Sequence, residues 1–135
     1  MTAKRNCLRC DHGQALVHGP RDLVFSYRDH KTIVPAVAGW HCPNCGECEF
    51  DPGEAARYSE AIDAFSAGVD REIAATVRAI RKRLGLKQAE AGRLFGGGVN
   101  AFSEYERGKT HPHRSTLLLL RLLDQHPELL RELVD

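Results

Sequence analysis

The sequence predicts an α+β fold in two domains: a small domain with a three-stranded sheet and a helix, followed by an all-α domain of five helices. Two observations predict this division. Apolar and polar residues alternate over much of residues 15–37, as in strands, whereas beyond residue 51 apolar residues recur every three or four positions, as in helices. The small residues 66–68 offer a boundary. We therefore assign residues 1–68 to the first domain and residues 69–135 to the second.

Length, composition and charge agree with this division. The chain has 135 residues, which suits two small domains, and its net charge is +1. Residues 1–69 carry a net charge of −2 and residues 70–135 one of +3, which permits the second half to approach nucleic acid. The amino terminus has no apolar segment typical of a signal peptide, and no apolar run approaches the roughly 18 residues that span a bilayer. We therefore expect a cytoplasmic protein.

Four of the five cysteines form two C-x-x-C pairs separated by 31 residues: Cys7 and Cys10, then Cys42 and Cys45. Four thiolates complete a tetrahedron around Zn²⁺ at about 2.3 Å each, as in structural zinc sites. The pairs predict a zinc-ribbon-like domain with one structural zinc ion per chain; four unligated cysteines or a redox pair are the alternative. Four sulfur ligands leave no open position, and no nucleophile–base pair is evident, so we expect no enzymatic activity.

Three further residues lie close enough in sequence to join this site. Cys48 continues the C-x-x-C spacing, and we interpret it as a thiol beside the site; an alternate ligand or a redox-labile thiol is the alternative. His12 and His41 lie near the cysteine pairs. Because four cysteines already complete a zinc site, we interpret both histidines as surface residues or as residues that support a ligand.

Between the cysteine pairs we predict three short strands joined by two turns. The strands are residues 15–18, 23–28 and 32–37, and the turns are residues 19–22 and 29–31. Pro35 indicates an edge position or a bulge. Since a three-stranded sheet is too small for a secure core, zinc should supply much of this domain's folding free energy.

Two helices should follow, one on each side of the boundary. Asp51 is a natural N-cap, Pro52 suits the first helical position, and this helix should end near Gly68. Its packing face holds Ala55, Tyr58, Ile62 and Phe65. Residues 70–84 predict a separate helix. Its inner apolar stripe comprises Ile73, Val77, Ile80 and Leu84. Its basic outer surface comprises Arg78, Arg81, Lys82 and Arg83.

Residues 84–112 predict two short helices joined by a glycine turn. One face of the first helix holds Leu86, Ala89, Ala91 and residues 94–95, and residues 96–98, all glycine, end it. The second helix, about residues 99–107, should bury Val99, Phe102 and Tyr105. Its outer face is polar and comprises Asn100, Ser103, Glu104 and Arg107. This is the pattern of a helix-turn-helix, whose second helix enters the major groove of DNA. A plain helical hairpin with a solvated face is the alternative.

At this point the sequence resembles a known family. The stretch FGGGVNAFSEYERGKTHPHRSTLLLLRLLDQHPELL is similar to the carboxyl-terminal half of MqsA-type antitoxins, whose DNA-binding part belongs to the XRE/Cro-like helix-turn-helix class. The resemblance extends to the amino-terminal cysteines and covers nearly the whole chain. It implies an antitoxin of a type II toxin–antitoxin system. The first half of such an antitoxin binds the toxin, an mRNA-cleaving ribonuclease, and the protein represses its own operon.

The resemblance also implies that an Asn and an Arg four residues later contact the bases. The Asn is Asn100, whose amide suits adenine N6 and N7; its alternative role is to cap the second helix. The Arg position holds Glu104, which can accept a hydrogen bond from cytosine N4 but cannot pair with guanine. Either the operator differs from that of arginine-bearing relatives, or specificity has moved to Asn100, Ser103 and Arg107. An internal ion pair of Glu104 with Arg107 or Lys109 is the third interpretation.

Other residues around the motif are candidates for phosphate contacts. After the second helix they are Arg107, Lys109, His111, His113 and Arg114, and at the start of the first they are Lys87 and Gln88. Lys87 stands at a cap position, where a lysine cannot accept hydrogen bonds from orphan N–H groups. This cap should therefore be weak.

Residues 115–123 predict a helix with too many leucines for one face. One face should fill the core and the other should contact a second copy, in a two-fold homodimer that recognises palindromic DNA. A fully buried helix in a monomer is the alternative. A final amphipathic helix should hold Leu129, Leu130, Leu133 and Val134.

The leading functional prediction is an antitoxin that binds operator DNA and a ribonuclease toxin, with no membrane partner. The alternative is a stand-alone zinc-containing helix-turn-helix transcriptional regulator without a toxin. The strand edge at residues 25–28 could receive a toxin strand, or it could simply complete a small sheet. A neighbouring gene for a small basic ribonuclease would separate the two predictions.

Overall fold

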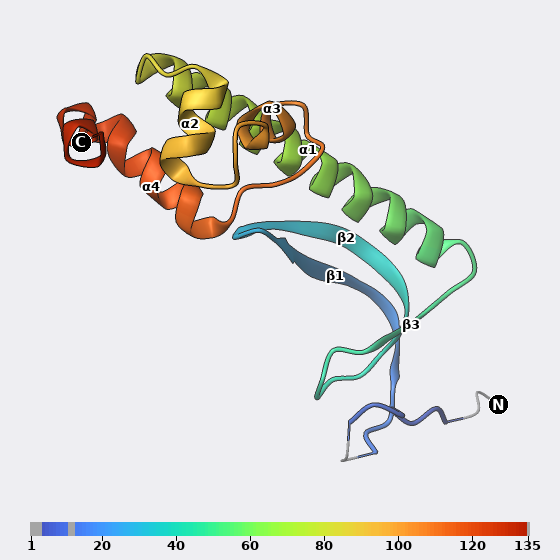
Figure 1. The fold of residues 1–135 in the computed structure, drawn as a ribbon. Coiled ribbons are helices and arrows are strands. Elements are labelled where there is room, and N and C mark those ends of the chain that lie inside the picture. The colour runs from blue at the N-terminus through green and yellow to red at the C-terminus, as the bar shows by residue number, and fades with distance from the viewer. Residues whose placement is uncertain (1–3, 11–12, 135) are drawn as a thin grey trace. The chain divides into compact units, whose positions relative to one another are not determined.

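The computed structural model describes residues 4–10 and 13–134. His12, one of the residues considered near the metal site, lies outside them. The chain divides into two compact units, Met1–Ala67 and Gly68–Asp135, and each is described by itself. Within the described residues, three strands come first and helices follow, which confirms the predicted α+β fold class (Figure 1).

The first unit contains an antiparallel sheet in the order β1-β2-β3. Its strands are β1 (Val17–Tyr27), β2 (His30–His41) and β3 (Cys48–Phe50). Arg28 and Asp29 form the two-residue turn between β1 and β2, with φ angles of 48° and 66°. A two-residue hairpin turn with both φ angles positive matches the right-handed twist of the strands that it joins.

The first two predicted strands are not separate, because β1 joins residues 17–18 to residues 23–27. Residues 19–22, predicted as a turn, lie inside β1, where Gly19 pairs with Gly39 and Pro20 with Ala38. An edge strand tolerates proline because the missing N–H is not needed by a neighbour on the outer side. The third strand is Cys48–Phe50, after the second cysteine pair, whereas residues 32–37 belong to β2. Pairing along β2 outweighs the local turn signal of Gly and Pro.

Of the two alternatives predicted for Pro35, the bulge is confirmed and the edge position is wrong, because β2 is the central strand. Arg21 pairs with Val37 and Leu23 with Val34, so Pro35 and Ala36 together lie opposite a single residue of β1. That residue is Asp22, whose Oδ1 accepts a hydrogen bond from the Ala36 N–H at 2.9 Å. Ala36 has a φ of 51°, and the Asp22 hydrogen bond helps to hold this left-handed conformation.

The long helix α1 (Glu54–Arg83) corrects the prediction of two separate helices, because it continues through residues 66–68. One glycine inside a helix costs about 1 kcal/mol, which the buried apolar residues that follow can offset. They are Val69, Ile73, Val77 and Ile80. Asp51 and Pro52 are not the N-cap and first helical residue as predicted, because α1 begins at Glu54; the Asp51 carboxylate binds His18 Nε2 at 2.8 Å instead.

Contacts with the sheet fix the first half of α1. Arg57 donates hydrogen bonds to the carbonyls of Pro35 and Ala36 at 3.1 and 2.9 Å, so the bulge also anchors the helix. The ring centroids of Phe25 and Phe65 lie 6.1 Å apart. Tyr58 and Phe65 of the predicted apolar face therefore contact the sheet, whereas Ala55 is exposed.

The second unit is helical. After the last part of α1 come α2 (Gln88–Phe95), α3 (Ala101–Glu106), α4 (Arg114–Gln125) and the 3₁₀ helix η1 (Pro127–Leu133). Its most deeply buried side chains are Val77, Ile80, Ala91, Phe102, Leu120 and Leu123. The final segment was predicted as an amphipathic helix without its type, and it is 3₁₀. No helix among the described residues is long and apolar enough to cross a membrane.

Candidate metal centre and nucleic-acid interface

The two C-x-x-C pairs meet in the first unit. The Sγ atoms of Cys7, Cys10, Cys42 and Cys45 all lie within 4.8 Å of one another. Cys7 and Cys45 are 3.5 Å apart at Sγ, and Cys10 and Cys42 are 3.7 Å apart. A tetrahedron of sulfurs about 2.3 Å from a zinc ion has edges of about 3.8 Å. The four cysteines are thus positioned to bind a metal ion, and their donor set suits zinc.

Backbone hydrogen bonds shape both loops that carry these cysteines. The Cys7 N–H donates to the Gln14 carbonyl and the Cys42 N–H to the Glu47 carbonyl, both at 2.8 Å. The Gly46 N–H donates to the Cys42 carbonyl at 3.0 Å, and the φ of Gly46 is 77°, a conformation that glycine adopts without strain. Each pair therefore lies in a tight turn that directs two sulfurs to one point.

The second turn also favours the thiolate form that a metal needs. The Cys45 N–H donates to Cys42 Sγ at 3.5 Å and lowers the pKa of the Cys42 thiol to about 6. At Cys45, a hydrogen bond from the Glu47 backbone lowers the pKa, but burial and the nearby Cys7 and Cys42 outweigh it and raise the pKa to about 11.

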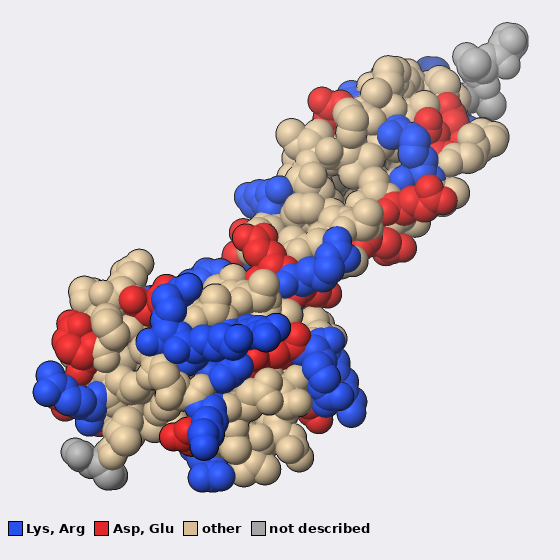
Figure 2. Space-filling model, turned by 90° about the horizontal axis from the view of Figure 1, so that it is seen from above, with Lys and Arg blue, Asp and Glu red and all other residues tan. Residues whose placement is uncertain are grey.

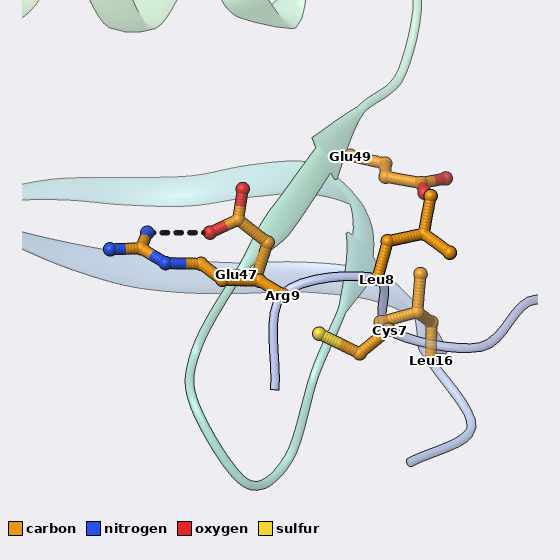
Figure 3. A pocket seen from close by; sticks show the side chains of 6 residues that line it. All are labelled: Cys7, Leu8, Arg9, Leu16, Glu47 and Glu49. Atoms are coloured by element: carbon orange, nitrogen blue, oxygen red, sulfur yellow. Dashed lines mark hydrogen bonds and ion pairs between the residues drawn. The ribbon is translucent and has the colours of Figure 1, made fainter. Parts of the chain in front are cut away.

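A cavity of about 260 Å³ lies beside Cys7, and Figure 3 shows the side chains that line it. Arg9 and Glu47 form an ion pair at 2.8 Å. Arg5 and Glu49 form another at 3.1 Å. Both pairs are exposed, so each contributes little to stability, but together they join the first cysteine loop to the segment around β3.

Cys48 and His41 lie outside the four-sulfur cluster. Cys48 is in β3 with its Sγ 4.0 Å from His41 Nε2, and burial raises the pKa of its thiol. His41 is not a surface residue: it is buried, and its Nε2 lies 3.1 and 3.0 Å from the carbonyls of Gly19 and Val37. Its ring ties β1 to β2 immediately before Cys42, which is a supporting role.

In the second unit, α2, a glycine turn and α3 form a compact helix-turn-helix. The three glycines 96–98 have φ angles of 94°, 92° and 90°. A Cβ at Gly92 would lie 2.0 Å from the Gly98 carbonyl oxygen, so the turn crosses directly over α2. Phe95 and Phe102 pack with their ring centroids 5.8 Å apart. Position 92 must be glycine to permit this approach, and glycine also adopts the φ angles of residues 96–98 without strain.

The second helix of the motif is shorter than predicted. Because α3 begins at Ala101, Val99 lies in the turn and is exposed, whereas Ala101 and Phe102 are buried. Asn100 occupies the N-cap position but makes no side-chain capping hydrogen bond. Its amide is thus not used for the alternative capping role.

The polar face of α3 carries the other predicted base-contacting residues. Ser103 and Glu104 are half-buried and Arg107 is exposed. Arg107 Nε donates to the Ser103 carbonyl at 3.2 Å. Lys109 Nζ lies 4.0 Å from Glu104 Oε1. Of the two internal partners considered for Glu104, the structure places Lys109 beside it, at a distance longer than a hydrogen bond.

An ion pair that the sequence did not reveal fixes the position of α3. Arg81 was predicted on the basic outer surface, but its guanidinium binds both carboxylate oxygens of Glu106 at 2.8 Å. The side chains are only 11% and 5% exposed. A third N–H of Arg81 donates to the Leu86 carbonyl at 2.8 Å. Arg81 thus links α1, the start of α2 and the end of α3.

Basic side chains surround the motif, and Figure 2 shows Lys and Arg gathered over one face of the second unit. Lys109, His113 and Arg114 are exposed near the start of α4. His111 is less available, because its Nε2 lies 3.7 Å from an Asp70 carboxylate oxygen. These positions leave room for phosphate contacts around α3.

The start of α2 carries the remaining two predicted residues. Lys87 is exposed and Gln88 is half-buried. Lys87 stands at the N-cap, and the Glu90 carboxylate accepts its backbone N–H at 3.2 Å. Half of a capping box therefore partly compensates for the weak lysine cap.

Comparison with known proteins covers both units. Residues 5–134 match the family described as "Antitoxin component of bacterial toxin-antitoxin system, MqsA". Antitoxin MqsA of Escherichia coli (strain K12) is 42% identical over 129 residues, which is 94% of this chain and 98% of that protein. The chain belongs to the MqsA antitoxin family. The predicted resemblance is confirmed.

A solved structure of part of an MqsA protein is also similar. The N-terminal domain of the E. coli protein MqsA matches 47% of this chain and 94% of its own, with 28% identity and a TM-score of 0.43. The family assignment itself depends on the sequence matches. The MqsA match includes the four clustered cysteines and the helix-turn-helix, which are the two features with functional chemistry.

Proposed function

We propose that this MqsA-family chain neutralises an mRNA-cleaving ribonuclease toxin of a type II toxin–antitoxin system and represses its own operon. One observation carries the proposal: a single family match runs through both the cysteine cluster and the helix-turn-helix. We propose a cytoplasmic location, because the chain would meet both the toxin and its operator DNA in the cytoplasm. No part of the proposal requires catalysis by this chain.

The metal that we propose is one structural Zn²⁺ per chain, held by Cys7, Cys10, Cys42 and Cys45. When bound, it would supply four bonds that join the loop before β1 to the turn after β2. The edges of the sulfur cluster support this choice, since they are close to those of a zinc tetrathiolate. Four sulfur ligands leave no position for substrate, so the role is structural.

For DNA we propose that α3 lies in the major groove with Asn100, Ser103, Glu104 and Arg107 toward the bases. Lys109, His113 and Arg114, together with Lys87 and Gln88 at the start of α2, would contact phosphates. The Asn100 side chain supports this arrangement, because it is exposed and makes no capping hydrogen bond. Such an amide can bind adenine N6 and N7 together.

A homodimer would place two such helices on a palindromic operator. Leu118 and Leu122 of α4 are 51% and 48% exposed, and Leu129, Leu133 and Val134 are also exposed. Leu120 and Leu123 fill the core from the opposite side of α4. A second copy that covers the exposed leucines would explain a helix with apolar residues on both sides.

The toxin would bind the first unit. In the described sheet, β1 is an edge strand with β2 on one side. Its outer backbone N–H and C=O groups can pair with a strand of a partner. Residues 25–28, which end this strand and begin the turn to β2, are therefore our candidate contact.

The test first looks for a neighbouring gene that encodes a small ribonuclease and then co-expresses that ribonuclease with this chain. We expect wild type to restore growth and to form a complex that survives gel filtration. Asn100→Ala should also restore growth while losing repression of a reporter. If wild type represses the reporter but neither restores growth nor binds the ribonuclease, the stand-alone regulator is the correct function.

A further inference from the structure

Glu104 puts a carboxylate in the middle of the polar face of α3. Residues 100, 103, 104 and 107 share this face because they are three or four positions apart. Ala101 and Phe102 on the opposite face are buried. The Glu104 side chain is 31% exposed, so its carboxylate reaches the surface that our proposed function presents to DNA.

The surroundings of Glu104 orient its carboxylate without neutralising it through a short ion pair. Lys109 Nζ is 4.0 Å from Oε1, whereas the guanidinium of Arg107 is engaged with the Ser103 carbonyl at 3.2 Å. Lys109 follows the helix and is itself exposed, so it can offset the repulsion between this carboxylate and nearby phosphates.

A carboxylate distinguishes the four bases by charge. Ionised Glu only accepts hydrogen bonds. In the major groove, guanine presents the acceptors N7 and O6, thymine presents O4, and adenine presents N7 next to its N6 amino group. Cytosine alone presents an amino donor, N4, with no acceptor on its own edge. A carboxylate is therefore attracted to cytosine and repelled most strongly by guanine.

We propose, on the basis of the DNA-binding function proposed above, that Glu104 determines operator specificity by accepting a hydrogen bond from a cytosine N4 amino group and by excluding guanine there. Lys109 positions the carboxylate and limits its repulsion from the DNA backbone. The operator therefore contains one cytosine per half-site that is recognised by this side chain.

The experiment measures Kd for the chain's own upstream DNA by fluorescence anisotropy, with each base pair of the half-site replaced in turn. For wild type we expect one C·G pair whose change to G·C weakens binding about tenfold or more. Glu104→Ala should bind both duplexes within about threefold, and Glu104→Arg should prefer the G·C duplex. Glu72→Gln removes the same charge from an exposed position of α1 and should keep the wild-type preferences.

A modified base provides the second arm. Replacing the identified cytosine by 2-pyrimidinone, which lacks only the N4 amino group, should weaken wild type about as much as the exchange to G·C or somewhat less. The same replacement should leave Glu104→Ala unchanged. Far-UV circular dichroism checks that each variant is folded.

The outcomes separate this inference from the function on which it rests. If wild type binds its upstream DNA no better than unrelated DNA, the proposed repressor function and the inference are both wrong. If wild type is specific but Glu104→Ala keeps every base preference, only the inference is overturned.

Discussion

The ion pair of Arg81 and Glu106 shows how one buried contact positions the short helix α3. Both residues are charged, and both are nearly inaccessible to water. Charges are removed from water at a high cost, which good geometry and additional hydrogen bonds must offset. Here three N–H groups of Arg81 are used, two on Glu106 and one on the Leu86 carbonyl.

Removing one member of this pair should therefore destabilise the second unit strongly. We expect Arg81→Ala to lower the free energy of unfolding by about 3–5 kcal/mol, because Glu106 remains buried without its partner. Urea denaturation followed by circular dichroism measures the loss. Arg83→Ala is the matched control: it breaks the exposed pair of Arg83 with Asp124 and should leave the free energy of unfolding nearly unchanged. Equal losses for the two variants would contradict the assigned role of Arg81.

For single residues, the sequence predicted sites formed by neighbours in the chain and missed contacts between residues far apart in it. The four cysteines could be identified because two thiols in a C-x-x-C turn already suit one ion. Arg81 could not be distinguished from Arg78 or Lys82, since all three follow the same helical pattern and only the fold places Glu106 beside one of them. The burial of His41 could not be predicted for the same reason, because it depends on the pairing of β1 with β2.

Among the elements, α1 and the helix-turn-helix use glycine in opposite ways. Gly68 lies inside α1, and a Cβ there would meet only an Arg71 side-chain nitrogen at 3.9 Å. Gly92 lies inside α2, and a Cβ there would meet the Gly98 carbonyl oxygen at 2.0 Å. The sequence suggested a helix end at the first of these glycines and gave no sign of the close contact at the second.

Alanine substitutions should consequently change stability in opposite directions. Gly68→Ala should raise the free energy of unfolding by about 0.5–1 kcal/mol, because alanine favours the helix and finds open space. Gly92→Ala should lower it by about 1–3 kcal/mol, because the turn must move away from α2. Thermal and urea denaturation of both variants check this. Destabilisation by Gly68→Ala would mean that α1 is interrupted at residues 66–68.

The strands show the same limit of sequence patterns at the level of elements. Alternation correctly indicated a sheet, and Pro35 correctly indicated a bulge. The patterns could not show that Gly19 and Pro20 continue β1, because the register with β2 decides this and not their own turn preference. The short β3 follows the cysteine turn and has too few residues for a recognisable period.

On the scale of the whole molecule, the two units should respond differently to loss of metal. The first has a three-stranded sheet and a small cluster of Cys7, Leu16 and Cys42 that includes two of the proposed zinc ligands. The second has a core of leucine, isoleucine, valine and phenylalanine side chains. We therefore infer that only the first unit depends on zinc for much of its stability.

Chelation of zinc should unfold the first unit selectively. Hydrogen exchange should lose protection in β1, β2 and β3 while α2, α3 and α4 keep it, since their core contains none of the four cysteines. Metal analysis should find one zinc per chain in wild type and in Cys48→Ser, and much less in Cys42→Ser. Full zinc content in Cys42→Ser, or uniform loss of protection after chelation, would contradict this division.

The central claim is that this MqsA-family antitoxin is also a sequence-specific repressor, and a DNA titration tests it most directly. Kd is measured for the chain's own upstream DNA and for a scrambled duplex, with wild type and Asn100→Ala at two salt concentrations. We predict that wild type prefers its own DNA by about 10³-fold or more. Asn100→Ala should lose about tenfold of that preference or more while its binding to the scrambled duplex, which depends on salt, is unchanged. Equal affinity of wild type for both duplexes at both salt concentrations would contradict the account.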